Sequence, residues 1–482
     1  MATHLIPFPR REVEPAASPA PGGKALAKLR EFLDKEGMAS REGPTDFADF
    51  ERKLHERLME VEREVVGEVM AKADVDAEAV VIGGRVHRKV LRGPETYLTA
   101  AGPVRVERTL YKDRTLPAQR AVSVMELRLG VVGGMWTPLA AEQGSWVVAQ
   151  LTPGKAEELF ERLGNMQPSK SSLDRLPKLI SERWEAGRET FESVLREGEG
   201  IPEGTKSVAV SLDGVLAPME GTKGPEKRRE TASRGRLTRG PAGYREVGCG
   251  TLSFCDGEGK LLKAVRLARA PEEHKATLKG MLQAELSAAL AKRPDLRVVK
   301  IADGAKDNWT FLSQQLPPGP DVLDFYHAAE HLNAALAAAY GDGTVEQRAR
   351  FASLREVLLD DPDGAGKVIA ALKYLHEKHP RKKKLATELA YFRRHRHHMQ
   401  YRTWQDEGLP VGSGVVEAAC KTLVAQRLKL SGMQWGDRGA QAILTLRGWD
   451  QSDRFDRAWA LVAATFHADV TTVQVAPRSE AA

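Results

Sequence analysis

Two aspartates, Asp213 and Asp303, each follow an apolar run and stand directly before a glycine. Alternating apolar residues in the run SVAVSLDGVL, residues 207–216, predict a buried strand that ends near Asp213. The run LRVVKIADG, residues 296–304, repeats this arrangement around Asp303. A carboxylate at the end of a buried strand is costly unless it is paired or binds a cation. Both aspartates are therefore candidate site residues, although Asp-Gly is also a common turn pair.

The elements around these acids predict how they meet. Residues 244–256 and 260–270 read as two antiparallel strands, and residues 271–293 as an amphipathic helix. Three strands followed by helix–strand repeats are the order of an RNase H-like domain, where the first and fourth strands lie side by side. Asp213 and Asp303 would then meet at one edge of the sheet. Two adjacent carboxylates repel unless a divalent cation lies between them, so the pattern predicts a metal site.

A third acid, Glu417, stands in a helix that opens after a Gly-Ser-Gly turn, with Lys421 one turn further on. The two residues could form an ordinary i,i+4 ion pair. Alternatively, Glu417 is a third metal ligand and Lys421 faces DNA. Arg427 continues this basic helix. Trp435, in the loop after it, could pack in the core or stack on a base.

Basic residues are clustered, although the formal net charge of +6 is modest for 482 residues. One cluster lies in a Gly- and Pro-rich loop, and a second lies on a partly aromatic helix. Phosphate contact and a merely solvated surface are both open interpretations. The candidates for DNA contact are Lys227, Arg228, Arg229, Arg234, Arg236 and Arg239 in the loop, and Lys382, Lys383, Lys384, Arg393 and Arg394 on the helix.

The length predicts two or three domains. Three cysteines without a CxxC spacing indicate neither a disulfide framework nor a thiolate zinc site. The sequence has no run of about 18 apolar residues, so we expect no membrane span. We expect a cytoplasmic, nucleoid-associated protein.

Around residues 153–196, two helices with a polar break could be a helix-turn-helix or plain helical packing. The expected division is a disordered tail (1–45), a mostly helical DNA-binding region with a small β meander (46–200), an α/β catalytic core (201–340 and 409–455) with an all-helical insertion (341–408), and a final helix and tail (456–482).

These segments together resemble a bacterial insertion-sequence transposase with an Asp-Asp-Glu active site, of the Mutator-like kind and the ISKra group within it. The matching segments are SLDG at Asp213, ADGAKDNW at Asp303, DFYH from Asp324 to His327, and GSGVVEAACK at Glu417. Such enzymes have a helical insertion before the glutamate, and the 417 − 303 = 114 residues between the two acids leave room for one. The resemblance covers roughly residues 207–449.

The resemblance implies that Asp213, Asp303 and Glu417 hold Mg²⁺, or Mn²⁺ in its place. One ion would activate water or a 3′ hydroxyl and another would stabilise the leaving oxygen. Asp324 and His327 would support the active site, and Asp324 is also a rival for the second catalytic acid. The implied function is to bind the inverted-repeat ends of an insertion sequence and to cleave and join strands. The implied partner is double-stranded DNA, both transposon ends and target, bound by a homodimer or larger assembly.

Two other interpretations come from different classes of protein. Residues His327 to His331 fit H-x-x-E-H, the inverted zinc-peptidase pattern, in which Glu417 could be the distal ligand. This interpretation leaves the two Asp-Gly strands and the basic clusters unexplained. A DNA-binding protein of transposase origin that has lost catalysis is the other alternative, although the sequence keeps all the expected acids.

Overall fold

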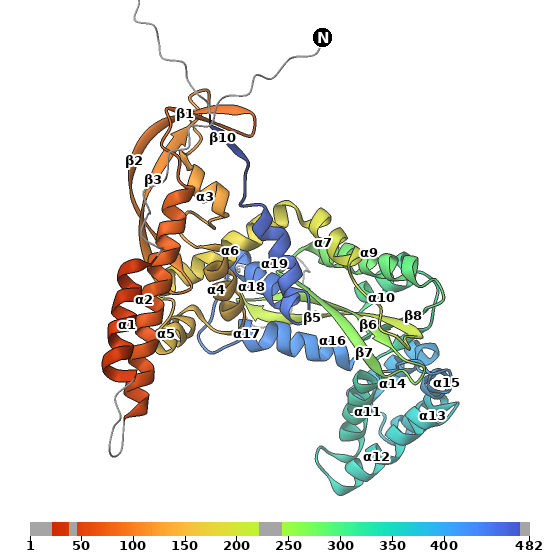
Figure 1. Ribbon diagram of the computed structural model, residues 1–482. Coiled ribbons are helices and arrows are strands. Elements are labelled where there is room, and N and C mark those ends of the chain that lie inside the picture. Colours follow the sequence, from red (N-terminus) through yellow and green to blue (C-terminus); the bar gives the residue numbers. More distant parts are fainter. Residues whose placement is uncertain (1–21, 38–45, 117, 221–242, 473–482) are drawn as a thin grey trace, which may run out of the picture. The chain divides into compact units, whose positions relative to one another are not determined.

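The computed structural model describes residues 22–37, 46–116, 118–220 and 243–472 (Figure 1). The chain divides into two compact units. The first comprises residues 1–143, 157–170 and 463–482, and the second comprises residues 144–156 and 171–462. The second unit thus begins before the expected boundary at residue 201, because α7 (Arg188–Glu197) contacts α9 (Ala276–Lys292) within it.

The first unit is built on an antiparallel sheet of order β10-β1-β2-β3-β4. Its strands are β1 (Ala79–Ile82), β2 (Arg85–Thr99), β3 (Gly102–Lys112), β4 (Val122–Ser123) and β10 (Val470–Thr472). Met70 of the long helix α2 packs against Val104 and Val106 of β3, which buries one face of the sheet. The predicted meander is confirmed. The expectation of a plain C-terminal tail is wrong for β10, which pairs with β1.

Helices complete the first unit and connect to the second. They are α1 (Gly23–Phe32) with the π-helical turn Leu33–Gly37, α2 (Phe47–Ala73), α3 (Val124–Leu129), α4 (Pro138–Gln150), α5 (Pro153–Leu163) and α6 (Lys170–Ala186). The pair suggested as a helix-turn-helix is α5 and α6. Most of α5 belongs to the first compact unit and nearly all of α6 to the second. The structure therefore does not describe the two helices as one helix-turn-helix.

The second unit contains a mixed sheet of order β7-β6-β5-β8-β9. Its strands are β5 (Ser207–Pro218), β6 (Tyr244–Cys255), β7 (Leu261–Arg269), β8 (Arg297–Ala302) and β9 (Asp321–Leu323). Strands β5, β6 and β7 pair antiparallel, whereas β8 pairs parallel with β5 and β9 pairs parallel with β8. The predicted adjacency of the first and fourth strands is confirmed. The protein is therefore an α/β protein with two five-stranded sheets, one of them mixed.

Strand β6 shows how both faces of this sheet are covered, since its side chains alternate between the faces. Val247 and Cys249 pack in a core with Val416, Cys420 and other residues of α16 to α18. On the other face, a Cβ atom at Gly250 would lie 2.7 Å from Leu282 of α9. Glycine at this position lets α9 approach the strand closely.

The remaining helices of the second unit include the expected insertion. Leu332 and Leu336 of α11 join Leu358, Leu372 and Leu389 of the insertion helices in one core. Figure 1 shows these helices gathered beside β8 at one end of the sheet. The bounds are α10 (Lys306–Gln315), α11 (Phe325–Tyr340), α12 (Val345–Asp360), α13 (Gly364–Lys378), α14 (Lys383–His395), α15 (Tyr401–Asp406), α16 (Gly414–Ala419), a π-helical turn (Cys420–Ala425), α17 (Gln426–Leu428), α18 (Asp437–Asp450) and α19 (Phe455–Ala464), with short 3-10 turns at Glu273–Lys275 and Arg396–His398. No helix in the described ranges combines the length and the apolar character that a membrane span requires.

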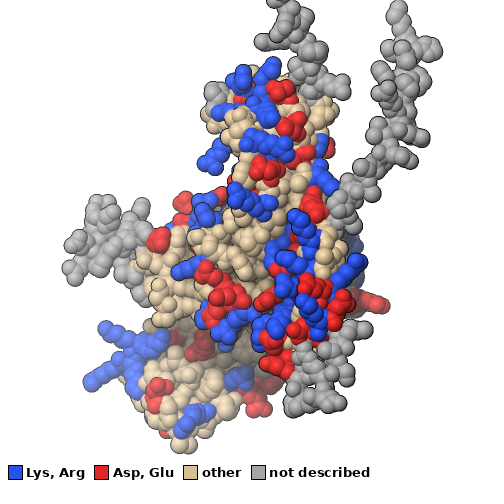
Figure 2. Space-filling model, turned by 60° about the vertical axis from the view of Figure 1, so that its left-hand side comes forward, with Lys and Arg blue, Asp and Glu red and all other residues tan. Residues whose placement is uncertain are grey.

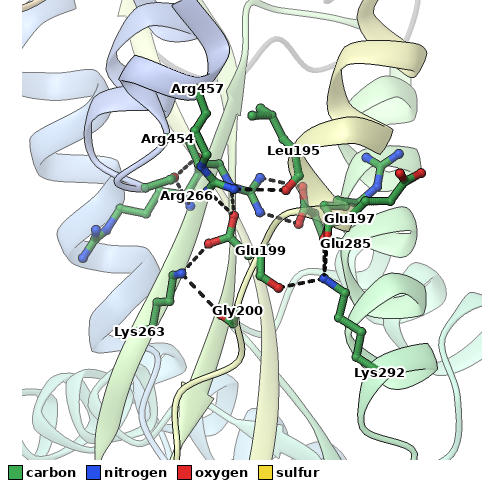
Figure 3. Close-up of polar contacts among 12 residues, drawn as sticks. Leu195, Glu197, Glu199, Gly200, Lys263, Arg266, Glu285, Lys292, Arg454 and Arg457 are labelled. Carbon is green, nitrogen blue, oxygen red and sulfur yellow. Dashed lines mark hydrogen bonds and ion pairs between the residues drawn. The ribbon is translucent and has the colours of Figure 1, made fainter. Parts of the chain in front are cut away.

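A buried ionic network ties several elements of the second unit together (Figure 3). Arg454 donates to Glu199 at 2.8 Å and to both carboxylate oxygens of Glu285 at 2.7 and 2.9 Å. Glu199 also pairs with Lys263 of β7 and with Arg457 of α19. The side chains of Arg454, Glu199 and Glu285 are only 5–8% exposed. The network therefore joins the segment after α7 to β7, α9 and α19.

Glu192 on α7 predicts a pH dependence of stability. Burial raises the pKa of its carboxyl from 4.5 to about 7, against the opposing effect of Arg188 and Arg196. Its contribution to stability is therefore fully present below pH 4.5 and is lost as pH rises through about 7. Glu192→Gln should remove this slope, on the order of 3 kcal/mol, in the melting temperature of the purified protein between pH 4.5 and 8. Glu189→Gln, an exposed residue of the same helix, is the matched control. An identical slope in wild type and Glu192→Gln would contradict the assignment.

Candidate active site

Asp213 and Asp303 follow the point at which the pairing of β5 with β8 ends. β5 itself continues to Pro218, with Asp213 paired to Cys249 of β6, so the expectation that this strand ends near Asp213 is wrong. The last register pair between the parallel strands β5 and β8 is Ser211 with Ile301, and each aspartate stands two residues further on. Together with Asp324, Glu417 and other residues, the two aspartates line a cavity of about 210 Å³. The structure therefore brings the three acids of the predicted site, and the rival Asp324, around one cavity.

Asp213 is held in position by two donors. Its Oδ1 accepts from the backbone N–H of Gly214 at 2.6 Å, and its Oδ2 accepts from the thiol of Cys420 at 3.6 Å. Burial raises the pKa of Asp213, and the carboxylate of Asp303 raises it further, while the Gly214 N–H, the Cys420 thiol and Lys275 act in the opposite direction. Cys420 was not predicted as a site residue. Its position 420 − 417 = 3 residues after Glu417 could have indicated that the two share a helix face.

Asp303 is fixed by a buried amide. Asn308, which is 2% exposed, donates its Nδ2 to Asp303 Oδ1 at 3.0 Å and to the carbonyl of Leu212 at 3.2 Å. Asp303 also accepts from the N–H of Ala305 at 3.1 Å. One side chain thus connects Leu212 of β5 to the residue that follows β8. The sequence analysis quoted Asn308 within a motif but gave it no role.

Asp324 has a different environment from the other acids. Its Oδ1 accepts from the N–H of His327 at 2.7 Å, which caps α11, and its Oδ2 accepts from the N–H of Ser413. Both oxygens therefore accept hydrogen bonds from backbone N–H groups. The contact with Ser413 fixes the Gly-Ser-Gly turn from which the helix of Glu417 begins. This geometry favours Asp303 over Asp324 as the partner of Asp213.

Among the described residues, the acids of this cavity have no basic side chain as an ion-pair partner. Across the described ranges, no ion pair of 4.0 Å or less joins a lysine or arginine to Asp213, Asp303, Asp324 or Glu417. Carboxylates are the ligands that Mg²⁺ prefers, and an unpaired, partly buried acid pair is stabilised by such an ion. The donor set thus fits a divalent cation. No group of three His, Cys, Asp or Glu side chains in the described residues is already close enough to hold a metal ion. Glu417 is exposed on α16 and would have to approach the aspartates.

A second, larger cleft of about 660 Å³ is also lined by Asp213 and Asp303. Its rim includes His274 and Lys275, two consecutive residues with φ of 52° and 53°. Such backbone conformations are unfavourable for residues other than glycine and cluster at functional sites. Lys275 pairs with Glu246 at 2.8 Å across this rim. No sequence signal indicated this turn.

His327 and His331 lie together on α11, with their Nε2 atoms 3.2 Å apart. The Nδ1 of His331 makes a 2.6 Å hydrogen bond with Glu388, and the Glu330 side chain is 81% exposed. No third His, Cys, Asp or Glu side chain in the described residues is arranged with both imidazoles to hold one metal ion. The geometry therefore does not support the zinc-peptidase interpretation.

Tyr391 was missed by the sequence analysis. Its ring stacks on His331 with centroids 3.8 Å apart, and a Cβ atom at Gly304 would lie 2.7 Å from it. Glycine after Asp303 thus makes room for this ring beside the acids. Burial raises the pKa of the Tyr391 phenol, and the charges of Asp303 and Glu388 add to the effect.

The predicted DNA contacts divide into three groups. Arg427 is 1% exposed and donates to the carbonyls of Val148 and Leu151, so its assignment to DNA is wrong. Trp435 packs against the core of α16 to α18 and donates to the carbonyl of Leu428, so it is placed as a packing residue and not for stacking on a base. Lys421, Lys382, Lys383, Lys384, Arg393 and Arg394 are exposed. The loop residues Lys227, Arg228, Arg229, Arg234, Arg236 and Arg239 lie outside the described residues.

Figure 2 shows one face of the molecule, where Lys and Arg side chains are interspersed with Asp and Glu and one basic group projects at its lower left. On this face the basic residues do not merge into one broad patch.

Comparison with known proteins adds no identity: no protein-family model matches the chain, and no curated protein is significantly similar to it.

Proposed function

We propose that this protein is a DNA transposase that binds the inverted-repeat ends of an insertion sequence and catalyses metal-dependent strand cleavage and strand transfer. One observation carries the proposal: Asp213 and Asp303 each stand two residues beyond the last pair between the parallel strands β5 and β8, and they share a cavity with Glu417. The absence of basic partners for these acids among the described residues leaves their charge available for a cation. The motif resemblance at all three acids adds to this support.

The same proposal assigns the second sheet to the RNase H-like fold. Three antiparallel strands are followed by two parallel ones in the order β7-β6-β5-β8-β9, which agrees with that fold's arrangement. The helices α12 to α15 then form an insertion between the aspartates and Glu417. The order of elements thus supports the fold assignment independently of the motifs.

In the proposed mechanism Asp213, Asp303 and Glu417 would hold Mg²⁺, or Mn²⁺ in its place. Bound there, the ions would supply activation of a water or 3′ hydroxyl and stabilisation of the leaving oxygen. Asn308 holds Asp303 next to Leu212 of β5. Asp324 anchors the turn that begins the helix of Glu417. Lys421, which is exposed one turn after Glu417, would contact a DNA phosphate.

The test is a cleavage assay on the DNA that flanks the coding region. Purified protein is incubated with labelled duplexes from both flanks, a target plasmid, and either Mg²⁺ or EDTA. We expect cleavage at the ends of an inverted repeat, and joining to the plasmid, only with Mg²⁺. Salt-sensitive binding without nicking in Mg²⁺ or Mn²⁺ would instead support the alternative, a DNA-binding protein of transposase origin without catalysis. Elution profiles with and without DNA would test the proposed homodimer or larger assembly.

A further inference from the structure

A chain of hydrogen bonds runs from the buried Glu388 on α14 to the acid cavity. Glu388 is 1% exposed, and its Oε2 lies 2.6 Å from Nδ1 of His331 on α11. Nε2 of His331 lies 3.2 Å from Nε2 of His327. His327 lines the 210 Å³ cavity together with Asp213, Asp303 and Glu417. One buried carboxylate is thus connected through two imidazoles to the wall of the proposed active site.

With Glu388 ionised and both imidazoles neutral, the hydrogen-bond geometry assigns each proton to one ring nitrogen. An ionised carboxylate only accepts hydrogen bonds, so Nδ1 of His331 must carry a proton. In neutral His331 the other nitrogen, Nε2, is then an acceptor, and the proton in the 3.2 Å contact belongs to Nε2 of His327. Neutral His327 therefore has a free lone pair on Nδ1. Within the described ranges this Nδ1 makes no hydrogen bond, and the Glu330 carboxylate lies 3.9 Å from it.

The surroundings hold this arrangement in place. The Tyr391 ring stacks on His331 at 3.8 Å with an interplanar angle of 12°, which restricts rotation of the imidazole. The second oxygen of Glu388 pairs with Lys384 at 2.5 Å, so the carboxylate is held from both sides. Asp324 accepts from the backbone N–H of His327 and so fixes the start of its helix.

We infer that Glu388 and His331 form a relay that holds His327 in the Nε2–H tautomer, so that Nδ1 of His327 accepts the proton of the attacking hydroxyl. This inference rests on the proposed function. In the step, the attacking oxygen forms a bond to phosphorus as the bond from phosphorus to the leaving 3′ oxygen breaks. The proton of the attacking hydroxyl moves to Nδ1 of His327, and the leaving oxygen takes a proton from solvent. His327 is the catalytic residue, and His331 and Glu388 are positioning residues.

The tautomers can be measured directly on the full-length protein. Two-bond ¹⁵N–¹H spectra of histidine-labelled protein distinguish protonated from bare ring nitrogens, and the variants His327→Gln and His331→Gln assign the two rings among the 12 histidines. In wild type we expect a proton on Nδ1 of His331 and on Nε2 of His327. Observation of His327 with a bare Nε2, or of rapid averaging between its tautomers, would overturn the inference.

Glu388→Gln removes the charge but keeps the shape of the side chain. We expect it to end the single-tautomer pattern of His327 and to lower the cleavage rate about 10- to 100-fold, whereas His327→Gln should lower it by about 10²- to 10⁴-fold. Glu377→Gln, an exposed change on α13, is the matched control and should alter neither readout. An unchanged tautomer and rate in Glu388→Gln would refute the relay. A wild-type protein that fails to cleave DNA at all would instead refute the proposed function, and the spectra would still decide the relay.

Discussion

Asp213→Asn, Asp303→Asn and Glu417→Gln should each lower Mg²⁺-dependent strand cleavage by about 10³-fold or more, while binding of the DNA ends stays within about twofold. Each change removes one negative charge from the 210 Å³ cavity and leaves the shape of the side chain nearly unchanged. Because the acids have no basic partner among the described residues, their removal breaks no ion pair. Loss of catalysis without loss of folding is therefore the expected result.

Asp324→Asn provides the contrast within the same cavity. Its carboxylate caps α11 and holds Ser413, so the change should mainly weaken these two contacts, at about 1–2 kcal/mol of stability. We expect a lower melting temperature and a smaller loss of cleavage than for Asp303→Asn.

The measurements are single-turnover cleavage over a Mg²⁺ titration, DNA binding by gel shift, and thermal melting. Full activity of Glu417→Gln would remove Glu417 from the site. If Asp324→Asn folds and is as inactive as Asp303→Asn, Asp324 would become a candidate again for the second catalytic acid.

The strand order around the acids could be predicted because it depends on local patterns. The apolar run that ends in Asp303-Gly304 marks the end of β8, whereas β5 continues past Asp213-Gly214 to Pro218. The parallel pairing of these strands follows from the order of elements. The roles of Asp303 and Asp324 could not be separated in this way, since both follow a strand. Only the structure shows that the Asp324 oxygens accept from two backbone N–H groups.

Arg427 and Glu388 are buried charged residues whose burial the periodicity of the sequence does not predict. A basic helix predicts solvent exposure for its arginines, but Arg427 is 1% exposed because the carbonyls of Val148 and Leu151 accept its protons. These partners are more than 270 residues away in sequence. Glu388 similarly lies in a charged helix and is 1% exposed, paired with His331, 57 residues distant. Such long-range polar pairs leave no spacing signal, so the burial of both residues was unpredictable.

Arg454→Met should cause the largest loss of stability in the second unit, about 3–5 kcal/mol. The change leaves Glu285, 5% exposed, without the two hydrogen bonds that its carboxylate accepts, and removes one of the three cations around Glu199. A buried charge without a partner costs far more than an ion pair gains at the surface. The loss of stability is measured by urea unfolding, followed by the fluorescence of Trp184 and Trp449, whose ring centroids lie 4.6 Å apart.

Two further variants separate the buried charge from lost packing. Arg438→Ala breaks an exposed ion pair with Glu182 and should cost at most about 1 kcal/mol. The double variant Arg454→Met with Glu285→Leu removes both charges and should recover part of the loss. An equal loss in the single and double variants would show that packing around Arg454, and not the unpaired Glu285, determines the stability.

Acid pH gives an independent test of the same network. Although burial alone would raise it, Arg454, Lys263 and Arg457 lower the pKa of Glu199 from 4.5 to about 2. The folded-state pKa is depressed, so its stabilising contribution is present above pH 4.5 and is lost as pH falls through about 2. Arg454→Met removes a major cause of this shift, and we expect a shallower fall in stability between pH 4.5 and 2 than in wild type. A fall of equal steepness in both proteins would mean that Lys263 and Arg457 hold the Glu199 charge without Arg454.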